Sequence, residues 1–151
     1  MSDPIEEAVQ RFQAGFNCAQ AVLSSFAGNY GVGEDVALRI AAPLGGGIAR
    51  TGQTCGAVSG AILVLGLAAG TTIPGDEPGR ERQYRMTGDL MTRFANAHGS
   101  TLCRDLLGCD IGTPHGRQQA RDQGLFANLC PGLVADAARL VVEVLQENPP
   151  T

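Results

Sequence analysis

Apolar side chains recur along much of the chain at intervals of three, four and seven residues, which is the spacing of one face of an α-helix. Residues 4–28 follow this pattern and are expected to form a single helix, with Asp3 as its N-cap and Pro4 at its first position. The apolar stripe of this helix consists of Ile5, Val9, Phe12, Phe16, Leu23 and Phe26. Cys18 lies off this stripe, on a second face made of small side chains.

The rest of the chain predicts further helices that glycine and proline separate from one another. The expected ranges are 34–43, a central helix from about Thr54 to Leu67 or Ala69, 80–98, 102–107, 114–123 and a last helix from Pro131 to about Gln146. Three consecutive glycines at 45–47 predict a glycine-rich loop before the central helix. Gly56 and Gly60 give the central helix an edge of small residues, which favours tight packing against a neighbouring helix.

The pattern contains no convincing strand and no internal repeat, so the expected fold class is all-α. We expect a compact helical bundle of about five to six helices. A chain of 151 residues fits one domain, here residues 1–151, with a frayed tail at about 147–151. Hydrophobic residues make up 44% of the chain, which argues for a folded protein and against disorder.

The charged residues limit which partners the protein can bind and which reactions it can catalyse. The net charge is −4, which argues against a nucleic-acid partner, and all 11 basic residues are arginines. Without lysine, the chain cannot form a Schiff base. The segment 57–69 is shorter than the roughly 20 apolar residues that span a bilayer, and the acidic start does not resemble a signal peptide. We therefore expect a cytoplasmic protein with no membrane partner.

Five cysteines are the candidate chemistry of this chain. Thiols stay reduced in the cytoplasm, so redox-active, metal-binding or simply buried cysteines are expected rather than permanent disulfides. Cys55, Cys103 and Cys130 are predicted at the start of helices, where the partial positive charge of the helix end stabilises a thiolate. The alternative is that they are inert, because free cysteine often serves as a small buried hydrophobe.

The sequence gives weaker support to a metal site with closely spaced cysteines and to a phosphate-binding loop. The cysteines form no C-x-x-C pair, although Cys103 and Cys109 could approach each other across a turn. Residues 47–54 follow the spacing of a phosphate-binding loop, but Gln53 stands where the loop needs lysine. Nucleotide binding is therefore not expected.

Four segments carry a resemblance to a known family. They are Asn17-Cys18-Ala19-Gln20-Ala21-Val22, then Gly45-Gly46-Gly47-Ile48 with Thr54-Cys55-Gly56-Ala57-Val58-Ser59-Gly60, then Cys103-Arg104-Asp105-Leu106-Leu107-Gly108, and Cys130-Pro131-Gly132-Leu133-Val134. Together they resemble the C_GCAxxG_C_C family of redox-active proteins over about residues 5–145. The order Cys-Gly-Ala at 55–57 departs from the family's Gly-Cys-Ala. The resemblance implies that the characteristic cysteines are Cys18, Cys55, Cys103 and Cys130, and that Cys109 is an extra one.

The leading hypothesis is thiol–disulfide exchange, or support of electron transfer, together with a redox partner protein. In it Cys55 or Cys130 is the attacking thiolate, and Cys18 or Cys103 resolves the mixed disulfide. Whether the protein is an enzyme stays open.

The alternative is a binding protein in which Cys18, Cys55, Cys103 and Cys130 hold zinc or an iron–sulfur cluster, with Cys109 as a further ligand. A third hypothesis is a scaffold domain whose buried cysteines are inert. The cofactor therefore stays open between none, zinc and an iron–sulfur cluster, and a homo-oligomer stays open as well.

Overall fold

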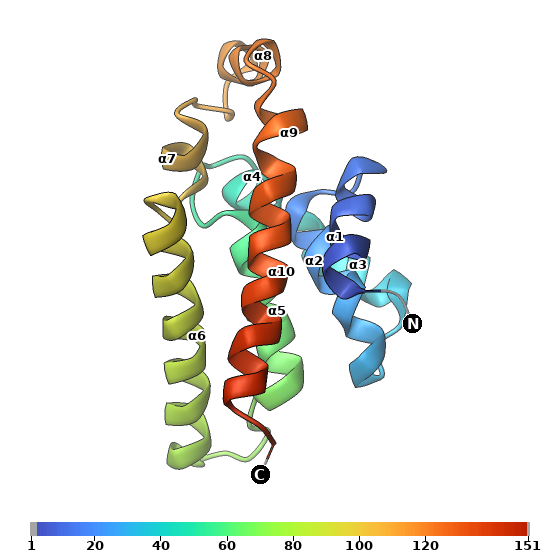
Figure 1. Cartoon of the computed structure of the whole chain (residues 1–151), viewed down its shortest axis with the longest axis vertical. Helices are drawn as coiled ribbons and strands as arrows, with labels where there is room; N and C mark the ends of the chain where they lie inside the picture. Colours follow the sequence, from blue (N-terminus) through green and yellow to red (C-terminus); the bar gives the residue numbers. More distant parts are fainter. Residues whose placement is uncertain (1–2, 151) are drawn as a thin grey trace.

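A computed structural model describes residues 3–150, and every regular element in that range is helical (Figure 1). The α-helices are α1 (Pro4–Gln13), α2 (Cys18–Ala27), α3 (Glu34–Ala41), α4 (Gly45–Ile48), α5 (Gly56–Ala69), α6 (Glu77–His98), α7 (Cys103–Leu107), α8 (Pro114–Asp122), α9 (Leu125–Asn128) and α10 (Cys130–Glu147). The all-α class is confirmed. The expectation of five to six helices is wrong, because short helices of four or five residues lie between the longer ones.

The predicted helix over 4–28 is also wrong, because the chain breaks between α1 and α2. Gly15 adopts φ +117°, which ends α1, and Asn17 then starts α2 as its N-cap. The Asn17 side chain accepts a hydrogen bond from the Gln20 N–H at 2.9 Å, and the Gln20 side chain accepts one from the Asn17 N–H at 3.0 Å. This reciprocal capping box satisfies two backbone donors at the new helix start. The break moves Cys18 from mid-helix to the first residue of α2.

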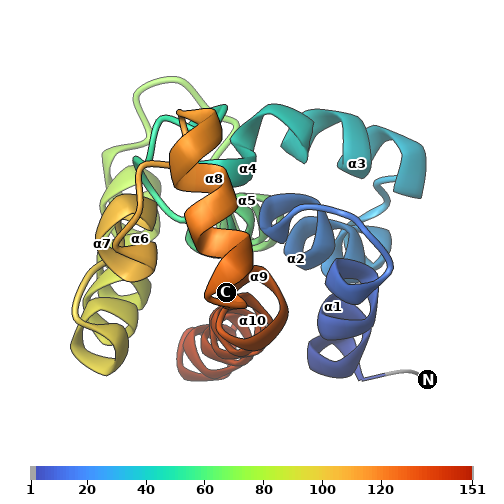
Figure 2. The same cartoon turned by 90° about the horizontal axis from the view of Figure 1, so that it is seen from above.

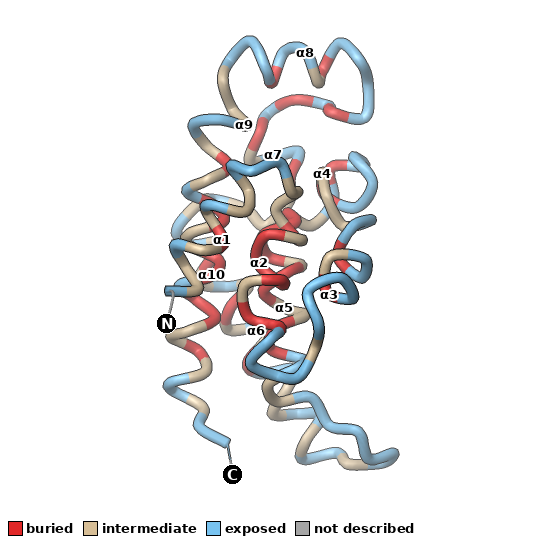
Figure 3. The backbone as a smooth tube through the Cα atoms, turned by 90° about the vertical axis from the view of Figure 1, so that its right-hand side faces the viewer, coloured by how far each residue is buried: buried red, intermediate tan, exposed pale blue. Residues whose placement is uncertain are grey.

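The helices pack around α5 at the centre of the molecule. Helices α5, α6 and α10 run along the long axis, and α1, α2 and α3 cover one side of them (Figure 1). Helix α8 lies across one end (Figure 2). Buried residues are concentrated in α2, α5 and the middle of α10, whereas most residues of α8 are exposed (Figure 3).

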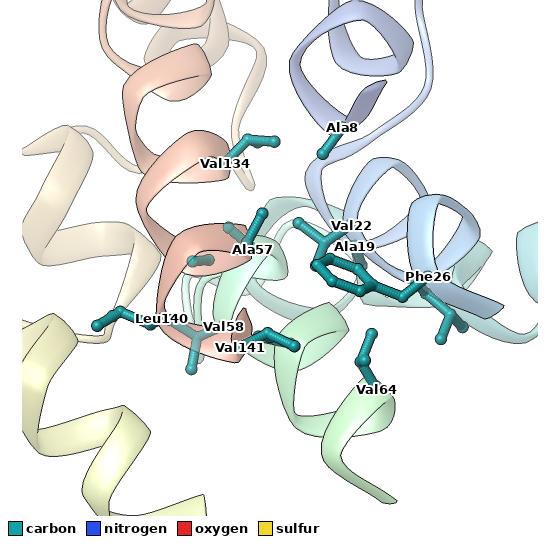
Figure 4. Close-up of a cluster of buried hydrophobic side chains, with 14 of the residues drawn as sticks. Ala8, Ala19, Val22, Phe26, Ala57, Val58, Val64, Val134, Leu140 and Val141 are labelled. Carbon is teal, nitrogen blue, oxygen red and sulfur yellow. The ribbon is translucent and has the colours of Figure 1, made fainter. Parts of the chain in front are cut away.

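Small residues let α2 and α5 approach each other closely. A Cβ atom at Gly60 would lie 2.8 Å from the Ala19 carbonyl oxygen, so only glycine fits there. Ala19 and Ala57 are fully buried, and they share the core with Val22, Val58 and Val134 (Figure 4). The small-residue edge predicted for the central helix is therefore an interface with α2.

The glycine run before α5 forms a short turn, α4, and not an irregular loop throughout. Five successive residues from Gly46 to Arg50 have φ between 52° and 68°, which is the left-handed region. The Gln53 N–H donates to the Gly47 carbonyl at 2.9 Å and closes the segment. A Cβ atom at Gly47 would lie 2.7 Å from the Cys103 Cβ, so this glycine allows α7 to pack directly on the turn.

Helix α10 carries the largest share of the apolar core on the C-terminal side. It begins at Cys130, one residue before the predicted start, and it packs against α1, α5 and α6. Residues Leu125–Glu147 are long and apolar enough to span a membrane by length and composition alone. Helix α5, which contains the segment 57–69, has 14 residues and is shorter than this stretch.

The C-terminal residues contact α6 in the described range. The Arg82 guanidinium donates to the carbonyls of Asn148 and Pro149, at 2.9 Å in each case. Fraying of 147–151 stays a prediction, and its last residue, Thr151, lies outside the described residues, as do Met1 and Ser2 at the other end of the expected domain.

Candidate functional site

Four of the five cysteines line one cavity. Its volume is about 130 Å³, and its lining contains Cys18, Cys55, Cys103 and Cys130. The other lining residues are mostly apolar or small: Phe12, Asn17, Gly46, Gly56, Leu106, Leu107, Ile111, Phe126 and Leu133. The structure thus gathers thiols that lie 27 to 112 positions apart along the chain (130 − 103 and 130 − 18). We refer to this space as the thiol cavity.

Each of these cysteines lies at the N-terminal end of a helix. Cys18 is the first residue of α2, Cys103 the first of α7 and Cys130 the first of α10, while Cys55 is the N-cap of α5. The sequence predicted this position for Cys55, Cys103 and Cys130. Cys18 also lies at a helix start, because the chain breaks before α2. The free N–H groups and the partial positive charge at a helix start favour a thiolate over a thiol.

A pair of backbone segments holds Cys55 beside Cys103. The Cys103 N–H donates to the Gln53 carbonyl at 2.7 Å, and the Cys55 N–H donates to the Thr101 carbonyl at 2.8 Å. Between these bonds, Thr54 and Leu102 form an isolated antiparallel bridge. The glycine turn and the start of α7 are therefore tied together just outside the thiol cavity.

Burial opposes the effect of the helix ends at Cys55 and Cys103. Burial raises the pKa of Cys55, although hydrogen bonds from the Ala57 and Val58 N–H groups lower it. Burial, with the neighbouring Cys55 and Cys130 thiols, raises the pKa of Cys103 to about 12. Burial therefore outweighs the effect of the helix start at these two cysteines, and both thiols are protonated at neutral pH.

Cys18 and Cys130 form a hydrogen-bonded pair of thiols. The hydrogen bond with Cys18 lowers the pKa of Cys130. The same contact, together with burial, raises the pKa of Cys18 well above its usual range. In this arrangement the Cys18 S–H donates to the Cys130 Sγ, and the negative charge is best accommodated on Cys130. All five cysteines are free, so no disulfide is present in the part of the chain described.

Cys109 lies outside the thiol cavity. It is buried in a small cluster with Leu107 and Ile111, close to the end of α7. The same cluster contains Cys103 and Cys130, so Cys109 lies near the thiol cavity without lining it. Its role as a further metal ligand stays a prediction.

The four thiols do not form a metal site in this conformation. Over residues 3–150, no group of three or more His, Cys, Asp or Glu side chains is arranged to hold a metal ion. The soft thiolates would suit zinc or an iron–sulfur cluster by their chemistry. Their arrangement does not fit such a group.

Sequence reasoning missed the residues that shape the cavity around the sulfurs. Asn17 lines it and caps α2, and Phe12 and Phe126 line it from α1 and α9. The spacing Asn17-x-x-Gln20 before an apolar run is a capping-box pattern, so it could have revealed the break in the first helix. No local pattern indicates that α1 and α9 supply aromatic side chains to the same cavity.

One comparison with known proteins gives a match. The model of the family described as "Putative redox-active protein (C_GCAxxG_C_C)" matches residues 16–144, which contain all four cavity cysteines. No curated protein and no solved structure matches the chain.

Proposed function

The chain belongs to the C_GCAxxG_C_C family of redox-active proteins, and from that premise we propose that Cys130 and Cys18 form a dithiol–disulfide couple. The observation that carries the proposal is that Cys18 and Cys130, at the starts of α2 and α10, line the same cavity, where Cys18 lowers the pKa of Cys130. A thiolate is the attacking form of cysteine, and a nearby second thiol can resolve the mixed disulfide. The pair has both features inside one cavity.

The proposed reaction oxidises the protein by two electrons. The Cys130 thiolate attacks one sulfur of a substrate disulfide, forms a mixed disulfide and releases the other half of the substrate as a thiolate. Cys18 then loses its proton and attacks the Cys130 sulfur. This step breaks the mixed disulfide, forms the Cys18–Cys130 bond and releases the second thiolate. The two protons from the protein thiols go to the two released thiolates.

Cys55 and Cys103 have a supporting role in this proposal. Because the pKa of each is raised, neither is the first nucleophile at neutral pH. Their neutral thiols keep the cavity free of further negative charge, which would destabilise the Cys130 thiolate beside them. A redox partner protein would reduce the oxidised couple and so return the protein to its dithiol form.

Intact-mass spectrometry on protein purified without oxygen tests the couple. Oxidation with bis(2-hydroxyethyl) disulfide should remove two hydrogens, and a non-reduced peptide map should then show Cys18 joined to Cys130. C130A should no longer lose two hydrogens on oxidation, whereas C109A, which alters a buried cysteine outside the cavity, should keep both the mass loss and the Cys18–Cys130 link. A different cysteine pair in the wild-type map, or loss of two hydrogens by C130A, would overturn the proposal.

The alternative of a bound metal or iron–sulfur cluster, which thiolates suit by their chemistry but which the arrangement of the thiols in residues 3–150 does not favour, is tested by the same experiment. The native mass of the same anaerobic sample separates the two functions. Added mass that a thiol-blocking reagent removes would favour the metal site. An apo mass, followed by loss of two hydrogens on oxidation, would favour the dithiol couple.

A further inference from the structure

A second, larger cavity adjoins the thiol cavity. Its volume is about 610 Å³, and three arginines line it: Arg50, Arg117 and Arg121. The two cavities share four lining residues, which are Asn17, Gly46, Ile111 and Phe126. A molecule held in the larger space can therefore extend toward the four thiols. We refer to this space as the arginine cavity.

The charge of the three arginines is not compensated by carboxylates. No Asp or Glu lines the arginine cavity, and none of the three arginines forms an ion pair within the described residues 3–150. Five arginines elsewhere, namely Arg11, Arg39, Arg80, Arg93 and Arg139, do pair with carboxylates. A concentration of unpaired positive charge in a chain of net charge −4 marks a place for an anion.

Local structure holds two of these arginines at the cavity. The Arg117 side chain is half-buried and donates to the Ile111 carbonyl at 3.0 Å. Arg50 ends the left-handed turn, and its own φ is 65°. A Cβ atom at Gly46 would lie 2.9 Å from the Arg50 Cγ, so the arginine stem lies across this glycine between the two cavities. Non-glycine residues adopt such a backbone only where the surrounding structure holds them in it.

We infer that the arginine cavity binds the carboxylate end of a small anionic disulfide, whose sulfur atoms enter the thiol cavity. The inference rests on the proposed redox function and assigns its substrate class. The guanidinium group has a planar set of donors that matches a carboxylate. The cavity volume is in the range that holds a small molecule, of about 300–1,000 Å³.

Three disulfides with the same two-carbon arms test the charge preference. They are 3,3′-dithiodipropionate, bis(2-hydroxyethyl) disulfide and cystamine, which are anionic, neutral and cationic. Each rate constant for oxidation of the protein is divided by the rate constant for free cysteine with the same reagent. The normalised rate should be about tenfold higher for the anionic reagent than for the neutral one at low salt, and it should fall as salt screens the arginines.

Charge-removing variants locate the preference. R50Q and R121Q should lower the ratio of the anionic rate to the neutral rate. R85Q is the matched control, because Arg85 is exposed on α6, has no ion pair within residues 3–150 and lies outside the cavity. It removes the same charge and should leave the ratio unchanged. Equal ratios in wild type and R121Q, or an equal loss in R85Q, would overturn the inference.

An unreactive analogue separates this inference from the proposed function. Suberate has six carbon atoms between its carboxylates, in place of the four carbon and two sulfur atoms of dithiodipropionate. Calorimetry should show suberate binding to wild-type protein and weaker binding to R121Q. Suberate binding without oxidation of the Cys18–Cys130 pair would overturn the redox function and support the anion site. Oxidation at equal normalised rates without suberate binding would overturn the anion site alone.

Discussion

Burial raises the pKa of Cys55 and Cys103, whereas a hydrogen bond from Cys18 lowers the pKa of Cys130. All four cavity cysteines sit at a helix start, so the helix end cannot explain the difference between them. The difference arises because burial penalises the charged thiolate, and only Cys130 receives an S–H donor that compensates for it. At the residue scale, the neighbours of a cysteine decide its acidity.

Removing the donor should make Cys130 less acidic. In C18A the Cys130 thiolate loses its hydrogen bond, so its pKa should rise and its alkylation at neutral pH should slow. The pH dependence of iodoacetamide labelling, read for the Cys130 peptide by mass spectrometry, measures the change. C18S keeps a hydroxyl donor and should show a smaller rise. An unchanged labelling curve in C18A would show that Cys18 does not set the acidity of Cys130.

The identity of the cavity cysteines was accessible from the sequence, but their acidity was not. The family resemblance maps onto Cys18, Cys55, Cys103 and Cys130, and the structure gathers these residues at one cavity. The pKa values depend on desolvation and on a contact between α2 and α10, which are distant in sequence. Neither the desolvation of a side chain nor a contact between distant helices can be read from a local sequence pattern.

At the scale of elements, helices α2 and α5 meet through small residues. Gly60 faces the Ala19 backbone, and both Ala19 and Ala57 are fully buried. This close approach brings the start of α2 beside the start of α5, and with them Cys18 beside Cys55. The close packing of the two helices therefore positions two of the four cavity thiols.

A methyl group at Gly60 should force these helices apart. Its Cβ would lie 2.8 Å from the Ala19 carbonyl oxygen, so G60A should lower the free energy of unfolding by about 1–3 kcal/mol. Gly66 is the control on the same helix, because a Cβ there meets nothing within 4 Å. G66A should be neutral or stabilising by up to about 1 kcal/mol. Urea unfolding measures both, and equal stability of the two variants would contradict this packing.

The spacing of apolar residues predicts most of the helical segments. It does not predict the break between α1 and α2. The apolar stripe continues from Phe12 through Phe26 because both helices turn an apolar face toward the core. Periodicity alone therefore indicates one helix. The break depends on Gly15 and on the Asn17 cap, which are single-residue signals within a continuous pattern.

At the scale of the whole molecule, the fold brings several helix starts to the same end. Helices α5 and α10 both begin toward the end of the molecule that carries α8 (Figure 1). The arginine cavity lies at this end too, with lining residues from α8 and from the turn after α4. One end of the bundle thus combines buried thiols with unpaired positive charge.

Buried neutral thiols should make the fold sensitive to alkaline pH. Cys103 has a pKa of about 12 in the folded protein, against an ordinary value of 9.0. Between these values the unfolded chain has lost the proton that the folded protein keeps, so stability falls as pH rises. Urea unfolding under reducing conditions between pH 9 and 12 measures this slope. C103A should show a shallower slope than wild type, and equal slopes would contradict the raised pKa.

The sequence by itself determined the helical class, most helix positions and the four cysteines that carry the family resemblance, because helix periodicity, glycine and proline signals and short cysteine-containing segments are local properties. Only the tertiary structure decided that these cysteines share a cavity, which of them is the most acidic and where the uncompensated arginines gather. Hydrogen bonding, desolvation and charge pairing depend on residues that are distant along the chain and adjacent in space. The Cys18–Cys130 pair, 112 positions apart (130 − 18), exists only because α2 and α10 start at the same cavity.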